Sequence, residues 1–336
     1  MARDEKHLVK AIRYDRYGPS GVLRLDEASV PEIGDEDVLV RVRAASVNPY
    51  DGHFMRGTPY FLRGAAGVLR PRHHGLGADL AGCVEDVGAS VTRFAPGDEV
   101  FGAMSPLGTL GSLAEYVRLR QDAVLAAKPT RLTFEQAAAV PLAACTALQA
   151  VRDKGRTRPG QRVLVNGAAG GVGTFAVQIA KALGAEVTGV CSTGKTELVG
   201  SIGADHVVDY TKQDFTRAGQ RYDVLVDTVG NRTLRDCRRA LAPQGVLVGV
   251  GGPDKGRWIG PLIRPVTMMA LSPVVSQTMG FFIAQPNRDD LAFLRKLLET
   301  GKVTPVIDRT CKLSEVPQAI SYLEEGHATG KIVISL

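Results

Sequence analysis

A glycine-rich run at residues 166–173 is the part of this sequence best suited by residue type and spacing to hold a charged ligand. It reads Asn-Gly-Ala-Ala-Gly-Gly-Val-Gly and stands between an apolar segment and a segment with apolar residues at helical spacing. Its glycines allow a tight turn and close passage of a diphosphate, and a helix beginning here presents unpaired N–H groups to that charge. The run therefore predicts a dinucleotide-binding loop rather than a glycine turn without a ligand. The predicted cofactor contacts in the loop are Gly167, Ala169, Gly170, Gly171, Val172 and Gly173.

Residues about 20 positions further on indicate which nicotinamide dinucleotide is bound. An NAD site carries a carboxylate there, which binds the ribose hydroxyls and repels a phosphate. This chain instead has Ser192, Thr193 and Lys195 after an apolar segment that ends at Cys191. Two hydroxyls and a cation favour the 2′-phosphate, so the sequence predicts NADPH rather than NADH.

The elements that position this loop form an alternating pattern of strands and helices from residue 161 onward. Strands separated by helices of this length form a parallel sheet with right-handed crossovers, so the predicted fold class is α/β with a doubly wound Rossmann sheet. The predicted strands are 162–165, 186–191, 206–208, 223–226 and 246–250, and the predicted helices are 172–183 and 233–241.

The segments on either side of this alternating pattern have different sequence patterns. Residues 8–120 contain short strand-like runs bounded by Gly, Pro and Asp, typical of a β-rich unit, and a capping box at 133–136 marks a helix start. A domain boundary near residue 126 follows. After residue 285 we expect a helix at 289–300, a strand at 303–306, a helix at 316–325 and a strand at 332–336, of which the last two complete the first domain.

Composition is that of a globular protein with two compact units. The 336 residues are 44% hydrophobic and 23% charged, with a net charge of +6. The basic residues are spread out, and their densest run, 232–239, is predicted to be a solvated helix face, so no nucleic-acid partner is expected. The apolar stretch 261–284 contains Arg264, Pro265, Pro273 and Gly280, which favour a buried strand over a membrane span.

The cysteines and the first twenty residues indicate the cellular compartment of the protein. The five cysteines are scattered, without a Cys-x-x-Cys pair, as in a protein of a reducing compartment and unlike a disulfide framework or zinc ribbon. The first twenty residues carry eight charges, which excludes the apolar core of a signal peptide there. The sequence therefore predicts a cytoplasmic protein without a membrane partner.

Four segments together resemble one known family. They are Ser-Val-Asn-Pro-Tyr-Asp at 46–51, Gly-Ala-Asp-Leu-Ala-Gly at 77–82, the loop at 168–173, and Gly-Lys-Ile-Val at 330–333. In this order they resemble the zinc-free quinone oxidoreductase branch of the medium-chain dehydrogenase/reductase superfamily. The resemblance spans essentially the whole chain and is more specific for fold and cofactor than for substrate.

The resemblance implies a GroES-like catalytic domain at 1–126, completed by 286–336, and a Rossmann NADPH-binding domain at 127–285. It also implies a homodimer formed through the last strand of the Rossmann sheet, at about 275–282. Residue by residue, Lys195 and Tyr210 match positions that hold the 2′-phosphate in similar reductases. The positions near the nicotinamide are matched by Phe281, Phe282 and Lys331, and those lining the active cleft by Asn48 and Asp51.

Departures from zinc-dependent relatives indicate the chemistry. Where those enzymes bind the catalytic zinc, this chain has Asn48, Ala78 and Leu142, and neither Ala nor Leu can coordinate a metal. Without a Lewis acid, the favoured small-molecule substrates are already electrophilic. A quinone or an α,β-unsaturated carbonyl delocalises the charge of an incoming hydride and needs mainly positioning and hydrogen-bond donors at its carbonyl.

Tyr50 stands where the zinc enzymes carry a proton-relaying hydroxyl, in a placement similar to the tyrosine of related enoyl reductases. With a reference pKa of about 10, a tyrosine is a hydrogen-bond donor at neutral pH. A role as an aromatic wall of the pocket is the alternative, and the sequence leaves both open.

The sequence therefore predicts an NADPH-dependent, metal-free enzyme that transfers a hydride to a quinone or conjugated carbonyl. One alternative is an enoyl-thioester reductase in which Arg56, Arg63, Arg70 or Arg72 meets a pantetheine phosphate. Another is an NADPH-binding protein with little turnover that acts through partners. Loops at 54–72 and 253–279 shape the pocket, and the sequence does not fix their conformations.

Overall fold

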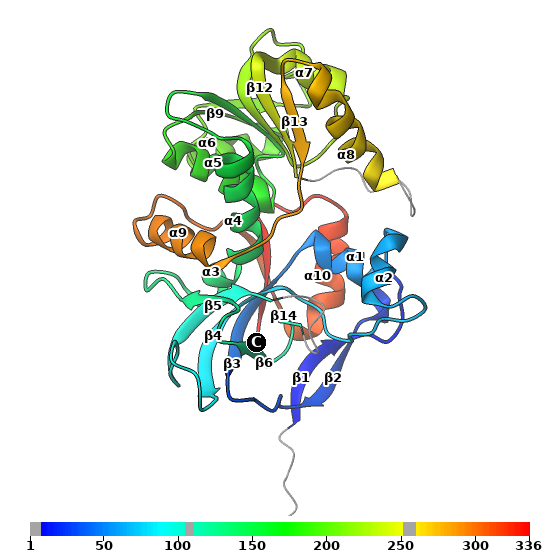
Figure 1. Cartoon of the computed structure of the whole chain (residues 1–336), viewed down its shortest axis with the longest axis vertical. Helices are drawn as coiled ribbons and strands as arrows, with labels where there is room; N and C mark the ends of the chain where they lie inside the picture. The colour runs from blue at the N-terminus through cyan, green and yellow to red at the C-terminus, as the bar shows by residue number, and fades with distance from the viewer. Residues whose placement is uncertain (1–7, 105–110, 251–259) are drawn as a thin grey trace, which may run out of the picture. The chain divides into compact units, whose positions relative to one another are not determined.

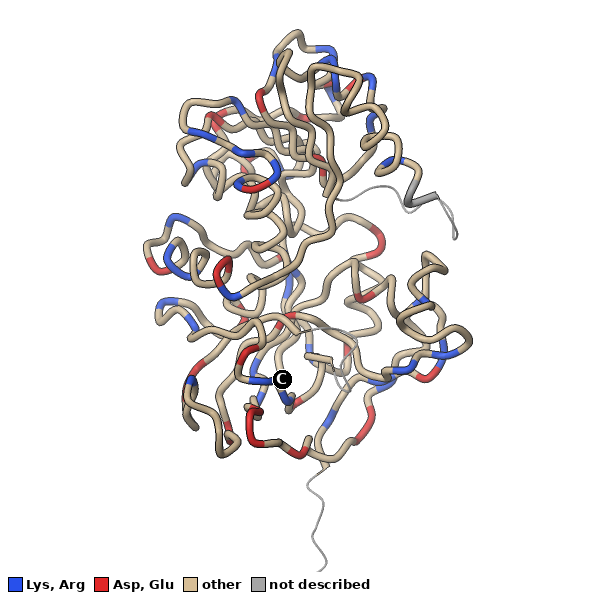
Figure 2. The backbone as a smooth tube through the Cα atoms, viewed as in Figure 1, with Lys and Arg blue, Asp and Glu red and all other residues tan. Residues whose placement is uncertain are grey.

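The computed structural model describes residues 8–104, 111–250 and 260–336 and divides into two compact units (Figure 1). Unit 1 comprises residues 1–142, 286–295 and 307–336, and unit 2 comprises 143–285 and 296–306. Lys and Arg are interspersed with Asp and Glu along the backbone of both units (Figure 2). No helix in the described ranges is both long and apolar enough to cross a membrane.

Unit 1 is β-rich, as predicted. Its main sheet has the order β14-β15-β3-β4-β5-β7, with β6 also paired to β3, and β1 and β2 form a separate antiparallel pair. In β3, Val38, Val40 and Val42 are buried whereas Arg41 and Arg43 are exposed, the alternation of a sheet with one face on a core. The strands are β1 (Leu8–Arg13), β2 (Arg24–Ser29), β3 (Asp37–Val47), β4 (Asp79–Val87), β5 (Glu99–Ala103), β6 (Tyr116–Arg120), β7 (Val124–Ala127), β14 (Ile307–Lys312) and β15 (Lys331–Ser335). The helices are α1 (Pro49–Arg56), α2 (Arg63–Ala66), α3 (Phe134–Ala138) and α10 (Val316–Glu324).

Unit 2 contains the predicted parallel sheet. Its six strands have the order β10-β9-β8-β11-β12-β13, and every pair is parallel, which is the strand order of a dinucleotide-binding Rossmann fold. The predicted fold class is therefore confirmed. The strands are β8 (Arg162–Asn166), β9 (Glu186–Cys191), β10 (His206–Asp209), β11 (Tyr222–Asp227), β12 (Leu241–Gly249) and β13 (Thr278–Phe281). The helices are α5 (Gly171–Ala182), α6 (Thr196–Ser201), α7 (Leu234–Ala240) and α8 (Gly260–Leu271).

The division between units differs from the predicted boundary at 126. The first boundary falls inside α4 (Pro141–Leu148) because α3 packs against β3, β4 and β5 of unit 1. A second falls inside α9 (Arg288–Glu299), so residues 296–306 belong to unit 2. Unit 1 is nevertheless completed by the C-terminal strands, since β15 pairs with β3.

Two segments differ from the predicted secondary structure. The stretch 261–284 begins with the helix α8, up to Leu271, and contains the strand β13 only near its end, whereas a buried strand was predicted. Ile263, Val266 and Met269 are exposed on this helix, so its apolar residues do not mark one buried face and the helical period is hidden. No strand forms at 303–306, and the strand β14 lies just after it.

Candidate functional site

The glycine loop has the geometry of a diphosphate cradle. Gly167 has a φ of +88°, a conformation that favours glycine, and its N–H donates to the Val190 carbonyl. A Cβ at Gly173 would lie 2.0 Å from the Gly167 carbonyl oxygen, so only glycine fits there, whereas the space at Gly170 is open with its nearest atom 3.5 Å away. The loop is thus closed on its protein side and open where a ligand would lie.

The helix that follows supplies the donors. Gly170 is the N-cap of α5, and the first helical hydrogen bond is the one from Thr174 N to Gly170 O. The N–H groups of Gly171, Val172 and Gly173 precede that bond and are the orphan donors of the helix start, where its dipole is positive. These residues fit the diphosphate of a dinucleotide.

The residues predicted for the 2′-phosphate come from the ends of two neighbouring strands. Ser192, Thr193 and Lys195 follow β9, and Tyr210 follows β10, whose register places Asp209 opposite Cys191. Tyr210 N donates to the Cys191 carbonyl, and the Tyr210 side chain is 48% exposed. The structure therefore brings this predicted group together.

Asp209 at the end of β10 is a carboxylate that the sequence analysis missed. Thr193 Oγ1 donates to Asp209 Oδ2 at 2.6 Å, and Thr211 donates its hydroxyl and its N–H to Oδ1 at 2.7 and 3.0 Å. The hydrogen bond from Thr193, with those from Thr211 and the Lys212 cation, lowers the pKa of Asp209 to about 2. It was missed because the spacing of about 20 residues points to the end of the second strand, whereas Asp209 ends the third. It places a negative charge beside the predicted phosphate group.

In unit 1, the predicted catalytic residue Asn48 belongs to a buried network around Asp79. Ser46 Oγ, Asn48 Nδ2 and Leu142 N donate to the Asp79 carboxylate at 2.8, 2.9 and 2.7 Å. Lys331 Nζ lies 2.5 Å from Asn48 Oδ1 and 3.4 Å from Asp79 Oδ2, and it also donates to the Val47 carbonyl. All of these residues except Leu142 lie within one residue of the end of a paired strand, so the sheet register sets their positions.

Lys331 was predicted to lie near the nicotinamide, together with Phe281 and Phe282. The structure places Lys331 beside Asn48, with 4% of its side chain exposed and its ammonium group bound by oxygens of unit 1. Phe281 lies in β13 and packs against the unit 2 core, and Phe282 follows it with Lys154 Nζ 5.9 Å from its ring centroid.

Asp51 is fully buried at the start of α1. Its carboxylate accepts the N–H groups of Asn48 at 2.7 Å and Gly77 at 3.1 Å. Burial raises the pKa of Asp51 to about 7, against the opposing effect of the Asn48 hydrogen bond. Because Asn48 and Asp51 are both buried and bound within unit 1, they hold the turn in place, and the group left accessible is Tyr50.

Tyr50 is half-buried and is the predicted catalytic residue best placed to meet a substrate. Its ring packs edge-on against Phe54, with centroids 4.7 Å apart, which fixes its orientation. Its hydroxyl makes no hydrogen bond to any residue that the structure describes. Burial, and secondarily the Asp51 carboxylate, raise the pKa of Tyr50 to about 12, so the phenol keeps its proton at neutral pH.

The three positions that match zinc ligands in related enzymes meet around Asp79. Asn48 and Leu142 both bind its carboxylate, and Ala78 precedes it in the chain. The side chains at the three positions are an amide, a methyl and an isobutyl group, and the Asp79 carboxylate between them is already bound by Ser46, Asn48, Leu142 and the Lys331 cation. This set does not suit Zn²⁺. Within the described ranges, no three His, Cys, Asp or Glu side chains lie close enough to share a metal ion.

Two families of known proteins match parts of the chain. Residues 34–129 match the alcohol dehydrogenase GroES-like domain, and residues 202–334 match the family described as zinc-binding dehydrogenase. The first match lies within unit 1, and the second runs from just before β10 of unit 2 into β15 of unit 1.

Individual relatives are similar over nearly the whole chain. The chain is 35% identical to the mouse (Mus musculus) NAD(P)H oxidoreductase RTN4IP1, mitochondrial, over 96% of its own length and 88% of that protein. It is 35% identical to the NADPH-dependent alkenal/one oxidoreductase, chloroplastic, of Arabidopsis thaliana, over 97% of this chain and 79% of that one. The solved structure of the quinone oxidoreductase from Coxiella burnetii matches with a TM-score of 0.86 at 30% identity, covering 98% of this chain and 99% of that chain.

Proposed function

Because the chain belongs to the zinc-free quinone oxidoreductase branch of the medium-chain dehydrogenase/reductase superfamily and is an oxidoreductase of the NAD(P)H-dependent kind, we propose that it reduces quinones or α,β-unsaturated carbonyl compounds with NADPH and without a metal. The observation that carries this proposal is the pairing of a diphosphate cradle in unit 2 with a lysine-centred network, instead of zinc ligands, in unit 1.

NADPH as the donor is supported by the groups at the ends of β9 and β10. When bound, the reduced nicotinamide supplies a hydride. The N–H groups at the start of α5 hold the diphosphate, and Ser192, Lys195 and Tyr210 suit a 2′-phosphate. The Thr193 hydroxyl donates its proton to Asp209, so it has no proton left to donate to a phosphate. Thr193 therefore contributes little to the affinity for the 2′-phosphate. Lys195 is therefore the residue on which discrimination depends most.

Tyr50 is the proposed hydrogen-bond donor to the acceptor. When a hydride adds to the β-carbon of an enone, the C=C electron pair shifts and negative charge develops on the carbonyl oxygen. A protonated phenol placed at that oxygen stabilises the enolate, and protonation of the α-carbon then completes the reduction. For a quinone the same donor stabilises the phenolate oxygen. With a pKa of about 12, Tyr50 keeps its proton throughout the neutral range.

A direct experiment is to mix the purified protein with NADPH or NADH and, in turn, a quinone, an enone and an enoyl-thioester. We expect oxidation of NADPH with the quinone or the enone, unaffected by a zinc chelator, and a preference for NADPH that drops about tenfold in Lys195→Met. Turnover of the thioester alone would favour an enoyl-thioester reductase. Tight NADPH binding with no turnover would favour a protein acting through partners, and activity that requires stoichiometric zinc would contradict the metal-free proposal.

We also propose that the protein is a homodimer joined along β13. In the described ranges β13 is paired only with β12, so its other edge can accept a strand. The neighbouring helix α8 exposes Ile263, Val266 and Met269, which are three residues apart on one face. Sedimentation should give a dimer for the wild-type protein and a monomer for Val266→Asp; a monomeric wild-type protein would contradict the proposal.

A further inference from the structure

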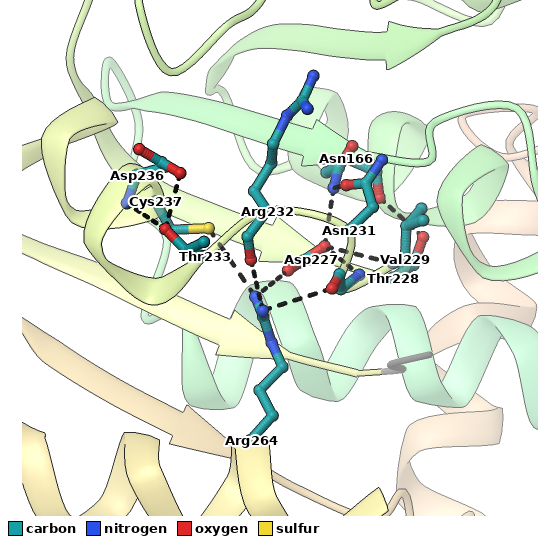
Figure 3. A network of polar contacts seen from close by, with 11 residues as sticks. Asn166, Asp227, Thr228, Val229, Asn231, Arg232, Thr233, Asp236, Cys237 and Arg264 are labelled. Carbon is teal, nitrogen blue, oxygen red and sulfur yellow. Dashed lines mark hydrogen bonds and ion pairs between the residues drawn. The ribbon is translucent and has the colours of Figure 1, made fainter. Parts of the chain in front are cut away.

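A second buried network lies in unit 2 and connects Asn166, Asp227 and Arg264 (Figure 3). Asp227 ends β11 with no exposed side-chain surface, and the sheet register places it opposite Asn166, the first residue of the glycine-rich run. Asn166 Nδ2 donates to Asp227 Oδ1 at 2.8 Å. The same oxygen accepts the N–H groups of Val229 at 3.3 Å and Gly230 at 2.9 Å. One carboxylate oxygen thus ties the loop after β11 to the loop after β8.

Arg264 closes this network from a different element. It reaches from α8, and its Nη2 lies 2.5 Å from Asp227 Oδ2, with 17% of the arginine side chain exposed (Figure 3). Its Nη1 donates to the Arg232 carbonyl at 2.6 Å and, more weakly, to the Gly230 carbonyl at 3.4 Å. A planar guanidinium can bind a carboxylate and two carbonyls at fixed angles, which a lysine ammonium cannot do as well. Arg264 therefore neutralises the Asp227 carboxylate and holds the backbone of residues 230–232 in place.

The clamped segment lies against the first turn of the glycine loop. Thr228 Oγ1 donates to the Asn166 carbonyl at 2.8 Å. A Cβ on Gly167 would lie 2.4 Å from Thr228 Oγ1 and 2.7 Å from a methyl of Val229, so the two loops are in contact. Val229 itself is 40% exposed at the carboxyl edge of the sheet, the edge where Rossmann folds bind their ligands. Movement of residues 228–230 would therefore move the turn at Gly167.

From this geometry we infer that Arg264 and Asp227 are a positioning pair for cofactor binding. They hold the loop after β11 against the glycine loop so that the diphosphate cradle is preformed before the nucleotide arrives. This inference rests on the proposed function only in requiring that a nicotinamide dinucleotide binds; it holds whatever the acceptor is. Neither side chain touches the nucleotide in this role, since both are bound to protein groups.

The test is nucleotide affinity in Arg264→Gln, which loses the charge and half of the fork, and in Arg264→Lys, which keeps the charge. Kd for NADPH is measured by nicotinamide fluorescence, together with KM and kcat and with hydrogen exchange at the Val229 and Gly230 amides in the free protein. For Arg264→Gln we expect Kd and KM for NADPH to rise about tenfold, kcat at saturating NADPH to stay within about threefold, and exchange at both amides to accelerate. Arg264→Lys should recover part of the affinity.

Arg238→Gln is the matched control. Arg238 Nε donates to Gln277 Oε1 at 2.9 Å in the same unit, also partly buried, and has no bond to the Asp227 network. It should keep wild-type affinity even if its melting temperature falls as far as that of Arg264→Gln. If Arg264→Gln folds and binds NADPH with wild-type affinity, the inference is overturned but the proposed function is not. If Arg264→Gln does not fold, wild-type affinity and amide protection in Arg264→Lys would overturn it, because the fork would then be dispensable. A wild-type protein that binds neither NADPH nor NADH would overturn the proposed function as well.

Discussion

In each unit, a buried aspartate at one end of a strand is paired with an asparagine and a cation. In unit 1, Asp79 begins β4 and meets Asn48 and Lys331. In unit 2, Asp227 ends β11 and meets Asn166 and Arg264. Both carboxylates are fully buried, so each needs its cation and several hydrogen bonds to offset the loss of hydration.

The two networks differ in what the cation holds. Lys331 has its shortest contact with the Asn48 side chain and lies further, 3.4 Å, from the Asp79 carboxylate. Arg264 is 2.5 Å from its carboxylate and also binds backbone carbonyls. The first arrangement orients side chains at the start of α1, where Tyr50 emerges. The second fixes a backbone loop. In this protein the lysine thus orients a side chain, whereas the planar guanidinium of the arginine binds a carboxylate and backbone carbonyls together.

The largest effect is expected from breaking the unit 1 pair with Lys331→Met. The variant leaves the buried Asp79 carboxylate without a cation, and removing one partner of a buried pair typically destabilises by about 3–5 kcal/mol. Urea unfolding should show this loss. In Lys331→Met/Asp79→Asn the charge is gone, and the Asn48 amide can turn to accept from the new amide, so much of the stability should return.

Lys128→Met is the control for that prediction. The Lys128 side chain is equally buried, at 5% exposure, but its partner Glu99 is 51% exposed and stays hydrated when the lysine is lost. We expect a clearly smaller loss. Equal losses in Lys128→Met and Lys331→Met would mean that lysine packing, rather than the stranded carboxylate, is responsible.

For unit 2 the corresponding prediction concerns Gly173→Ala in the glycine loop. The added Cβ would lie 2.0 Å from the Gly167 carbonyl oxygen, so the backbone of the cradle must shift. Overpacking of this kind costs about 1–3 kcal/mol. We expect a similar loss in the free energy of NADPH binding, measured by fluorescence titration, and no change in the structure of unit 1 around Tyr50.

Gly200→Ala is the matched control in the same unit, and we expect it to leave NADPH binding intact. No atom lies within 4 Å of a Cβ built at Gly200, which is exposed in α6, so alanine should raise stability slightly and leave NADPH affinity unchanged. If Gly173→Ala also binds NADPH like the wild type, the loop does not serve as the cradle.

Much of the fold could be predicted because local pattern and tertiary structure agree. The strand 186–191 was predicted with the bounds that β9 has, since an apolar run between two glycine-marked turns leaves little choice. The helix α8 was missed because its exposed face is apolar. The glycine loop and the group Ser192, Thr193 and Lys195 were predicted from spacing along one βαβ unit, whereas Tyr210 was predicted only from the resemblance to the family. Contacts between distant segments were not, since they depend on register.

Lys331 and Asp227 illustrate that limit. Lys331 is 283 residues from Asn48, and only the pairing of β15 with β3 brings them together. An acid that ends an apolar strand, such as Asp227, is visible in the sequence as a residue that must find a partner. Its partner Arg264 lies in the stretch predicted as a strand, so the pair could not be predicted.

At Asp51 we expect stability to depend on pH. The buried carboxyl has its pKa raised to about 7, whereas in the unfolded chain it is near 3.8. Between these values the folded protein holds a proton that the unfolded chain has released, so stability falls as pH rises from about 4 to 7, by up to ~1.4 kcal/mol per unit. Asp51→Asn cannot ionise and lacks this slope. Urea midpoints of the two proteins should therefore diverge in favour of the variant as pH rises, and parallel curves would contradict the raised pKa.

The smallest effect is expected at the third carboxylate, Asp209, which is not deeply buried. Thr193→Val removes the hydroxyl that donates to Asp209, but Thr211 and Lys212 still bind the carboxylate. Since the Thr193 proton points at Asp209 and not at the predicted phosphate position, Kd for NADPH should change by less than about threefold, against about tenfold for Lys195→Met. Fluorescence titration with NADPH and NADH measures both. A tenfold loss for NADPH alone in Thr193→Val would instead mean that this hydroxyl turns from Asp209 to the phosphate when the nucleotide binds, and that an exposed network, unlike the two buried ones, rearranges for its ligand.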